Sequence, residues 1–248
     1  MARTIVITGA SRGIGAATAV LAATSGYDVC VNYRSDEAAA RRVVSRIENT
    51  GRRAVAIQAD VANEADVIRL FETVDRQLGR VDALVNNAGV LETQMRLDAM
   101  SGERLQRIFM TNVVGSMLCA REAVKRMSVR HHGSGGAIVN LSSAAARLGS
   151  PDEYVEYAAS KGAIDTFTIG LAKEVAADGI RVNAVRPGLI HTDMHASGGE
   201  PERIARLQAT VPMQRGGTAE EVAHAILWLL SDEAAYVNGA ILDVSGGR

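Results

Sequence analysis

Short runs of apolar residues alternate with longer amphipathic segments along the whole chain. The apolar runs are rich in Val and Ile, as strands covered on both faces tend to be. Seven runs fit this description, at residues 4–8, 28–33, 54–58, 83–86, 137–141, 181–185 and 240–244. Because strand and helix patterns alternate, the sequence predicts an α/β fold: a doubly wound, seven-stranded parallel sheet with right-handed crossovers and helices on both faces.

Two of the expected helices begin with capping residues. Asn63 precedes a helical pattern that runs to about residue 78, and Thr218 with Glu221 forms a capping box for a helix that runs to about residue 230. Residues 191–217 are polar, glycine-rich and weakly patterned, apart from a short helical stretch at 202–210. We interpret this segment as a mobile substrate lid.

Composition narrows the class of protein. The 248 residues, 47% hydrophobic and 22% charged, are ordinary for one globular domain spanning residues 1–248. With a formal net charge of −1, the chain lacks the excess of basic residues that is typical of nucleic-acid-binding proteins. No apolar run approaches the ~20 residues that cross a bilayer, and the N-terminus lacks the features of a signal peptide. We therefore expect a cytoplasmic protein with no membrane or nucleic-acid partner.

The cysteines and histidines predict neither a disulfide nor a metal site. Cys30 falls in a predicted strand and Cys119 on a predicted helix, so both are expected to be reduced core residues. His191 and His195 would share a face if that segment were helical, but no third ligand accompanies them.

A glycine-rich turn joins the first predicted strand to a helix. Glycines there allow a tight turn, let the backbone approach a pyrophosphate and pack the helix on the sheet, while the helix N-terminus offers free N–H groups to the anion. The position of this pattern, between strand and helix, is what supports a dinucleotide site. The residues expected to hold the cofactor here are Gly9, Ser11, Arg12, Gly13, Ile14 and Gly15.

The end of the second strand indicates which dinucleotide binds. Enzymes that use NAD usually place an acid about 20 residues past the glycines, for the ribose 2′-hydroxyl. This chain has Tyr33, Arg34 and Ser35 instead, with Arg12 in the glycine turn. Guanidinium groups match phosphate oxygens, so we predict that NADP(H) is preferred over NAD(H). Asp36 and Glu37 argue mildly the other way, and we interpret them as first-turn helix residues.

Three further strand ends carry candidate cofactor residues. Asp60, followed by Val61, could accept a hydrogen bond from an adenine amino group, or could simply be a turn or cap aspartate. Asn87, Ala88 and Gly89 suit a loop where backbone approaches a ligand, although a simple turn would look the same. After the sixth strand, the turn containing Pro187, Gly188, Ile190 and Thr192 leaves the sheet at its carboxyl edge, where such sheets bind ligands.

The stretch 137–161 carries the candidate chemistry. A strand ends in Ser142 and Ser143, and a helix follows with Tyr157 and Lys161, whose i,i+4 spacing puts both on one face. A cation beside a phenol favours the phenolate, so we expect Lys161 to lower the pKa of Tyr157 and prepare it for general acid–base work. The alternative is that Tyr157 and Lys161 are ordinary exposed residues of an amphipathic helix. Tyr154 has no lysine at i+4, and we interpret it as a packing or substrate-wall residue.

Asn112 lies within a helical pattern, where asparagine is unfavourable because it competes for backbone hydrogen bonds. It could bend the helix and expose a carbonyl to a water, which makes it a candidate link in a proton path. A satisfied core asparagine is the alternative.

Taken together, these stretches resemble the short-chain dehydrogenase/reductase family, with its Rossmann-type fold. The motifs are TGASRGIG at 8–15, NNAG at 86–89, Asn112, Ser143, YAASK at 157–161 and PGLIHT at 187–192. The resemblance implies that Tyr157 is the acid/base, Lys161 binds the nicotinamide ribose, Ser143 holds the substrate oxygen and Asn112 fixes a water. The family's serine usually stands 13 residues before the tyrosine; the spacing for Ser143 is 14, so this loop is expected to be one residue longer.

From its place in the turn after the sixth strand, Thr192 could bond the cofactor's carboxamide. The resemblance also implies a homotetramer or a dimer. The chain looks similar to 3-oxoacyl-carrier-protein reductases and to glucose-dehydrogenase-like members. We therefore expect an NADP(H)-dependent enzyme that interconverts a carbonyl and a secondary alcohol. Two alternatives remain: a 3-oxoacyl-carrier-protein reductase specifically, or a non-catalytic dinucleotide sensor. Arg126, Arg130 and Lys173 could face an acidic carrier protein, but we favour the interpretation that they are plain exposed helix charges.

Overall fold

In the computed structural model, which describes residues 2–248, seven parallel strands form one sheet in the order β3-β2-β1-β4-β5-β6-β7. This confirms the predicted doubly wound α/β fold, and each predicted strand is present with its ends shifted by two residues at most. The strands are β1 (Arg3–Ile7), β2 (Tyr27–Tyr33), β3 (Ala54–Gln58), β4 (Val81–Asn86), β5 (Gly136–Leu141), β6 (Ile180–Pro187) and β7 (Ile241–Val244).

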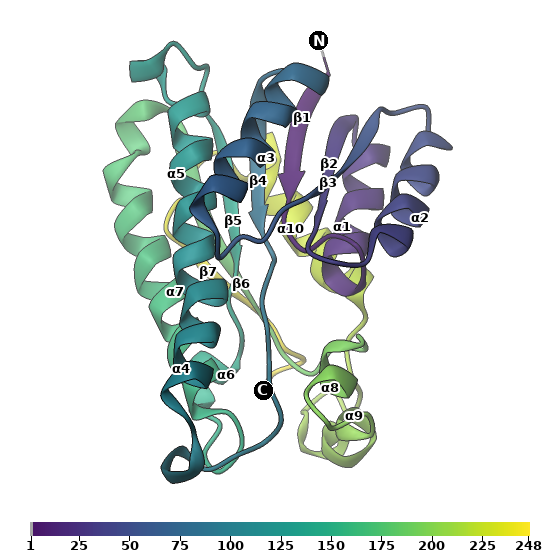
Figure 1. Cartoon of the computed structure of the whole chain (residues 1–248), viewed down its shortest axis with the longest axis vertical. Coiled ribbons are helices and arrows are strands. Elements are labelled where there is room, and N and C mark those ends of the chain that lie inside the picture. Colours follow the sequence, from purple (N-terminus) through teal and green to yellow (C-terminus); the bar gives the residue numbers. More distant parts are fainter. Residues whose placement is uncertain (1) are drawn as a thin grey trace.

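Helices cover both faces of the sheet (Figure 1). Two buried apolar clusters result, one beneath α1, α2 and α10, the other beneath α3, α5 and α7. Burial of these Val, Ile, Leu and Ala side chains is the main force that holds the layers together. The helices are α1 (Gly13–Thr24), α2 (Glu37–Glu48), α3 (Glu64–Gln77), α4 (Gly102–Phe109), α5 (Gly115–Met127), α6 (Ala145–Leu148), α7 (Val155–Glu174), α8 (Met194–Ser197), α9 (Arg203–Leu207) and α10 (Ala219–Leu230).

Both predicted helix caps are present. The Asn63 side chain accepts a hydrogen bond from the Asp66 N–H at the start of α3, and Thr218 and Glu221 form the complete capping box of α10. The helix expected at 202–210 is α9, which ends at Leu207 and continues as a 3-10 turn (Gln208–Thr210). The small residues after Ser143 predict a loop, whereas the structure has the short helix α6 there.

The carboxyl ends of the strands and the short helices α6, α8 and α9 lie at one end of the molecule (Figure 1). At the point where the chain order reverses, between β1 and β4, the connections leave the sheet in opposite directions. Sheets of this kind hold their ligands at this position, outside the carboxyl ends of the strands. The residues singled out in the sequence follow the ends of β1 to β6 and so gather there.

Candidate active site

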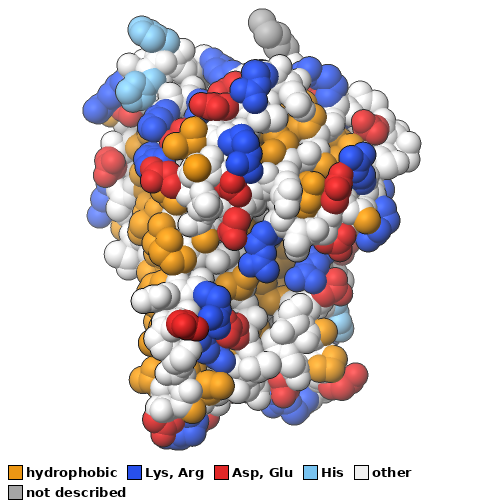
Figure 2. Space-filling model, in the orientation of Figure 1, with side chains coloured by type: hydrophobic (Ala, Val, Ile, Leu, Met, Phe, Trp, Pro, Cys, Tyr) orange, Lys and Arg blue, Asp and Glu red, His pale blue; other side chains and the backbone are white. Residues whose placement is uncertain are grey.

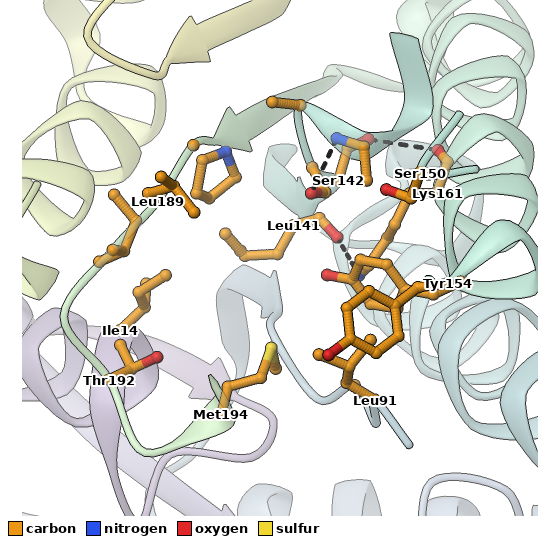
Figure 3. Close-up of a pocket in the computed structure, with 18 of the residues that line it drawn as sticks. Ile14, Leu91, Leu141, Ser142, Ser150, Tyr154, Lys161, Leu189, Thr192 and Met194 are labelled. Carbon is orange, nitrogen blue, oxygen red and sulfur yellow. Dashed lines mark hydrogen bonds between the residues drawn. The ribbon is translucent and has the colours of Figure 1, made fainter. Parts of the chain in front are cut away.

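Tyr157 and Lys161 lie on the same side of α7, facing a cavity. Tyr157 is partly exposed, whereas Lys161 is 4% exposed. The Lys161 ammonium lies 5.6 Å from the centre of the Tyr157 ring and donates a hydrogen bond to the Leu141 carbonyl at the end of β5, at 2.7 Å. Figure 3 shows Lys161 and Tyr154 on one side of this cavity, with Leu189 and Thr192 on the other. The i,i+4 spacing thus brings a phenol and an ammonium together at the cavity wall.

The acidity of Tyr157 differs from the sequence expectation. Burial raises the pKa of Tyr157 to about 12, and a hydrogen bond from Ser143 only partly opposes this rise. Burial also lowers the pKa of Lys161 to about 8, with the Asp165 carboxylate acting in the opposite direction. The predicted lowering of the Tyr157 pKa by Lys161 is therefore wrong for this arrangement of the site. The physical reason is that loss of water around the phenolate outweighs the influence of the lysine, which is itself poorly solvated.

The low pKa of Lys161 gives a testable pH dependence. Its folded value of about 8 lies below the ordinary 10.5, so between these values the unfolded chain binds more protons than the folded one. The contribution of Lys161 to the free energy of unfolding should therefore rise with pH in this window. We therefore compare the free energy of unfolding in urea of the wild type with that of Lys161→Met. The wild-type value minus the variant value should increase by about 1–2 kcal/mol between pH 7.5 and 9.5. A difference that stays flat with pH would contradict a buried, poorly solvated ammonium.

The two serines after β5 face different ways. The buried Ser142 hydroxyl donates to the Lys161 carbonyl on α7, at 3.2 Å. The Ser143 hydroxyl lies beside Tyr157, whose pKa it lowers, and its Oγ accepts from the Ala145 N–H at 3.1 Å. Ser143, and not Ser142, is thus the serine beside the phenol. The longer loop contains α6, which ends at Gly149 in a left-handed conformation with φ of 74°.

Asn112 lies in a π-helical turn, Met110–Val114, between α4 and α5. The expected disturbance of the helix therefore takes the form of a wider turn. The fully buried side chain accepts from the Val90 N–H at 2.8 Å and donates to the Ser160 hydroxyl at 3.1 Å, which ties the loop after β4 to α7. The Asn112 carbonyl accepts from the Ser116 hydroxyl at 3.0 Å.

The glycine turn is shaped by close backbone approach. Gly9 and Gly13 have φ of 61° and 55°, in the region that favours glycine. A Cβ on Gly9 would lie 2.9 Å from the Ala88 Cα, and one on Gly15 would lie 2.5 Å from the Asn87 amide nitrogen. Gly15 is thus needed for packing and does not line the cavity that holds the other glycines.

Two side chains fix this turn in place, one within β2 and one just after β4. The Asn87 amide donates to the carbonyls of Thr8 and Gly9 at 2.9 and 3.0 Å. The buried Asn32, within β2, accepts from the Gly9 N–H at 3.1 Å and donates to the Ala59 carbonyl at 3.1 Å. Sequence reasoning missed Asn32. The signal available was one asparagine near the end of a mostly apolar strand, where a buried amide must find partners.

A groove runs from the glycine turn past the ends of β2, β3 and β4. Most of the residues predicted to hold the cofactor line it, namely Gly9, Ser11, Arg12, Gly13, Ile14, Arg34, Ser35, Asp60, Val61, Asn87, Ala88, Gly89 and Thr192. Tyr33 does not: it is 7% exposed and packs in the core beneath α1 and α2. Because side chains alternate along a strand, Asn32 occupies the groove in place of Tyr33.

Two arginines, Arg12 and Arg34, line the groove just after β1 and β2. Arg12 and Arg34 are exposed, and neither forms an ion pair within residues 2–248. Asp36 also lines the groove, where it caps α2 by accepting from the Ala39 N–H at 2.8 Å. Asp60 accepts a hydrogen bond from the Ala62 N–H at 3.0 Å, as a turn aspartate does. It also lines the groove, so the turn contact and a contact with a bound cofactor are compatible.

A second cavity continues from the groove toward Tyr157. Ile14, Gly89 and Thr192 line both spaces. Around Tyr157 the walls also contain Ser143, Lys161, Pro187, Gly188 and Ile190. Tyr154 is a wall residue as predicted, buried, with its hydroxyl donating to the Gly198 carbonyl at 3.4 Å. A long ligand in the groove would therefore end beside a phenol, a serine hydroxyl and an ammonium.

Cys30 and Cys119 are free and buried, as expected, and burial raises the pKa of both thiols. Among residues 2–248 there is no cluster of His, Cys, Asp or Glu that could hold a metal ion. No helix in the same range is long and apolar enough to cross a membrane.

The chain belongs to the short-chain dehydrogenase/reductase family. The family model described as enoyl-(acyl carrier protein) reductase matches residues 9–248. The chain is 57% identical over 98% of its length to an uncharacterized oxidoreductase, YgfF, of Escherichia coli K12, of which it covers 98%. It is 41% identical over 99% of its length to 3beta-hydroxysteroid dehydrogenase 1 of Eggerthella lenta, of which it covers 93%.

A solved structure is also similar over nearly the whole chain. It is that of a blue fluorescent protein from a metagenomic library in complex with NADPH, with 36% identity and a TM-score of 0.91, covering 99% of this chain and 97% of that one. As a member of this family, the chain is an oxidoreductase that uses NAD(P) and acts on CH–OH groups of small molecules.

Proposed function

We propose that this protein is an NADP(H)-dependent oxidoreductase that interconverts a carbonyl and a secondary alcohol, with Tyr157 as the proton donor and acceptor. One observation carries the proposal: the dinucleotide-shaped groove opens directly onto Tyr157, Ser143 and Lys161. General acid–base work on a C–O centre requires a proton-transferring group within hydrogen-bond reach of the reacting oxygen.

Each residue has a distinct part in the proposed reaction. A bound nicotinamide supplies or accepts the hydride. Ser143 and Tyr157, which line the same cavity side by side, hold the substrate oxygen between them. In reduction, the Tyr157 hydroxyl gives its proton to that oxygen. Lys161, whose pKa is about 8, would bind the ribose and pass a proton toward Tyr157, with Asn112 and its carbonyl as the link to water.

The preference for NADP(H) is proposed from the ribose end of the groove. Arg12, Arg34 and Ser35 offer two guanidinium groups and a hydroxyl to a 2′-phosphate. Asp36 faces the same space, but one of its oxygens is already used in the cap of α2. NADP(H) therefore fits the residues present better than NAD(H) does.

Replacing Arg34 with Asp should reverse this preference. A carboxylate would repel the 2′-phosphate and accept a hydrogen bond from a 2′-hydroxyl, so kcat/KM for NADPH should fall about 100-fold and that for NADH should rise. Steady-state kinetics with both cofactors measures the ratio. Arg76→Asp, on the exposed face of α3, changes the net charge equally and should leave the ratio unchanged. A wild-type enzyme that already prefers NADH would refute the assignment.

The reaction class is tested by following NADPH oxidation at 340 nm with a panel of ketones, sugars and oxoacyl thioesters. We expect turnover with at least one ketone and the reverse reaction with the matching secondary alcohol. Binding of NADPH without turnover of any carbonyl would favour the alternative, a non-catalytic dinucleotide sensor.

A carrier-protein substrate gains no support from the basic residues suspected of contacting it. Arg126 is ion-paired with Asp75 and Glu122, and Arg130 with Asp178. A carboxylate therefore already offsets the charge of each of these arginines. Of the three residues, Lys173 is the one for which contact with an acidic carrier protein stays a prediction.

The homotetramer or dimer, the cytoplasmic location, the single domain and the lid at 191–217 stay predictions. Half-exposed apolar side chains on neighbouring helices, Met117 on α5 and Ile169 on α7, support self-association. Hydrophobic side chains gather on the side of the molecule where these helices lie (Figure 2).

A further inference from the structure

The cavity beside Tyr157 has an uneven distribution of charge. Within residues 2–248, its lining contains the cations Lys161, Arg203 and Arg248 and no aspartate or glutamate. Most of the remaining wall is apolar, with Leu91, Leu148 and Met194 among the side chains. The side chains that line this enclosure favour a negative group, because field lines are concentrated between poorly polarisable walls. The Glu153 carboxylate, which is paired with Arg203, lies outside the lining.

Arg203 is the cation whose position is best defined. It begins α9, is 8% exposed, and its guanidinium lies over the Tyr154 ring at 5.1 Å. Nη2 donates to the Glu153 carboxylate at 2.5 Å, while Nη1 is buried without a hydrogen-bond partner. A guanidinium has five N–H donors, so the ion pair with Glu153 leaves donors for a ligand. A buried N–H without an acceptor is costly, and an acceptor on a bound molecule would remove that cost.

Arg248 is held at the same cavity by the end of the chain. Its carbonyl accepts from the Arg147 guanidinium at 2.9 Å and from the Ser245 hydroxyl at 2.8 Å. These contacts fix the C-terminal residue so that it lines the cavity from the side of β7. Arg203 from α9 and Arg248 after β7 therefore both line the space that Tyr157 faces.

We infer that the substrate carries a carboxylate in addition to its reacting oxygen: it is an aliphatic oxo acid in one direction and the hydroxy acid in the other. This inference rests on the proposed function, because it places the carbonyl at Tyr157 and Ser143. The carboxylate pairs with Arg203, since guanidinium and carboxylate match in shape and charge. The aliphatic chain between the two groups lies against the apolar wall. Arg203 is then a specificity-determining residue.

Matched substrates test the inference. The kcat/KM for oxo acids of four to eight carbons is compared with that for their methyl esters, which differ only in the negative charge. Wild type should favour the acids by tenfold or more, as expected when a charge-assisted hydrogen bond is made or lost. Arg203→Met should remove the preference by lowering kcat/KM for the acids, with the esters little changed.

Two further variants separate charge recognition from support of the lid. Arg206→Met, on the same helix, removes an equal charge from a residue that is outside the cavity lining and half-exposed, and should keep the preference. Glu153→Gln/Arg203→Met avoids leaving the Glu153 carboxylate alone, and should behave like Arg203→Met. One outcome would overturn the inference. In it, Arg203→Met and Arg206→Met both lose all activity, while the double variant Glu153→Gln/Arg203→Met keeps the preference for acids. Arg203 would then act only by supporting the lid.

The outcomes distinguish this inference from the proposed function. Esters reduced as well as or better than acids would overturn the carboxylate and leave the reaction class in place. If no carbonyl compound is reduced, the proposed function fails, and calorimetric titration of hexanoate into the NADP⁺ complex then decides the inference. Hexanoate binding that Arg203→Met weakens tenfold or more supports the carboxylate site, and no binding refutes it.

Discussion

Replacing Tyr157 with Phe is expected to reduce turnover by more than about a hundredfold while NADPH binds as it does to wild type. The substitution removes one hydroxyl and keeps the ring, which packs beside Lys161. Since the hydroxyl is the group within reach of both Ser143 and a substrate oxygen, its loss removes the proton donor without opening the groove. Steady-state kinetics and a fluorescence titration with NADPH measure the two effects separately.

Tyr154→Phe is the matched control for this experiment. Tyr154 lines the same cavity and has the same ring, but its hydroxyl makes a long bond to the Gly198 carbonyl and its i+4 residue is Ala158. Its loss should lower turnover less than tenfold, in keeping with one weak hydrogen bond. Turnover of Tyr157→Phe near that of wild type, or an equal loss in both variants, would remove the acid/base role from Tyr157.

Replacing Arg104 with Ala should destabilise the protein by about 3–5 kcal/mol, the usual effect of leaving a buried charge alone. Arg104 on α4 is ion-paired with Glu156 at the start of α7, and the two side chains are 4% and 1% exposed. Glu156 already has one oxygen without a partner, so losing the arginine would leave its carboxylate wholly unpaired. Urea unfolding measures the free energy. Because Glu156 directly precedes Tyr157, turnover should fall as well.

Two controls separate a buried pair from an exposed one. Arg107→Ala breaks an ion pair with Glu92 whose arginine is 57% exposed, and should cost less than about 1 kcal/mol. The double variant Arg104→Met/Glu156→Leu removes both charges and should recover much of the stability lost in Arg104→Ala, because the unpaired carboxylate is absent. A loss below about 1 kcal/mol in Arg104→Ala would contradict the proposed importance of this pair.

The fold was predictable because its signals are local. Apolar runs marked the strands, and Asn63 and Thr218 marked two helix starts with side chains that bond within three residues. Glycine at position 9 could be assigned to a special turn for the same reason, since its positive φ follows from the tight turn between strand and helix.

The features that sequence reasoning missed depend on residues far apart in the chain. Arg104 and Glu156 are 52 residues apart, and nothing local in either predicts the other. Asn32 meets Gly9 and Ala59 only once the sheet has formed. The raised pKa of Tyr157 has the same origin, because spacing reports which residues are neighbours but not how much water surrounds them.

The most direct test of the central claim is a titration of the purified wild-type protein with NADPH and NADH, followed by fluorescence. We expect NADPH to bind at least tenfold more tightly than NADH, because Arg12 and Arg34 line the groove where the ribose 2′-phosphate is proposed to bind. NADH binding equally or more tightly would contradict the assignment of both arginines. Binding of neither dinucleotide would contradict the proposed reaction itself.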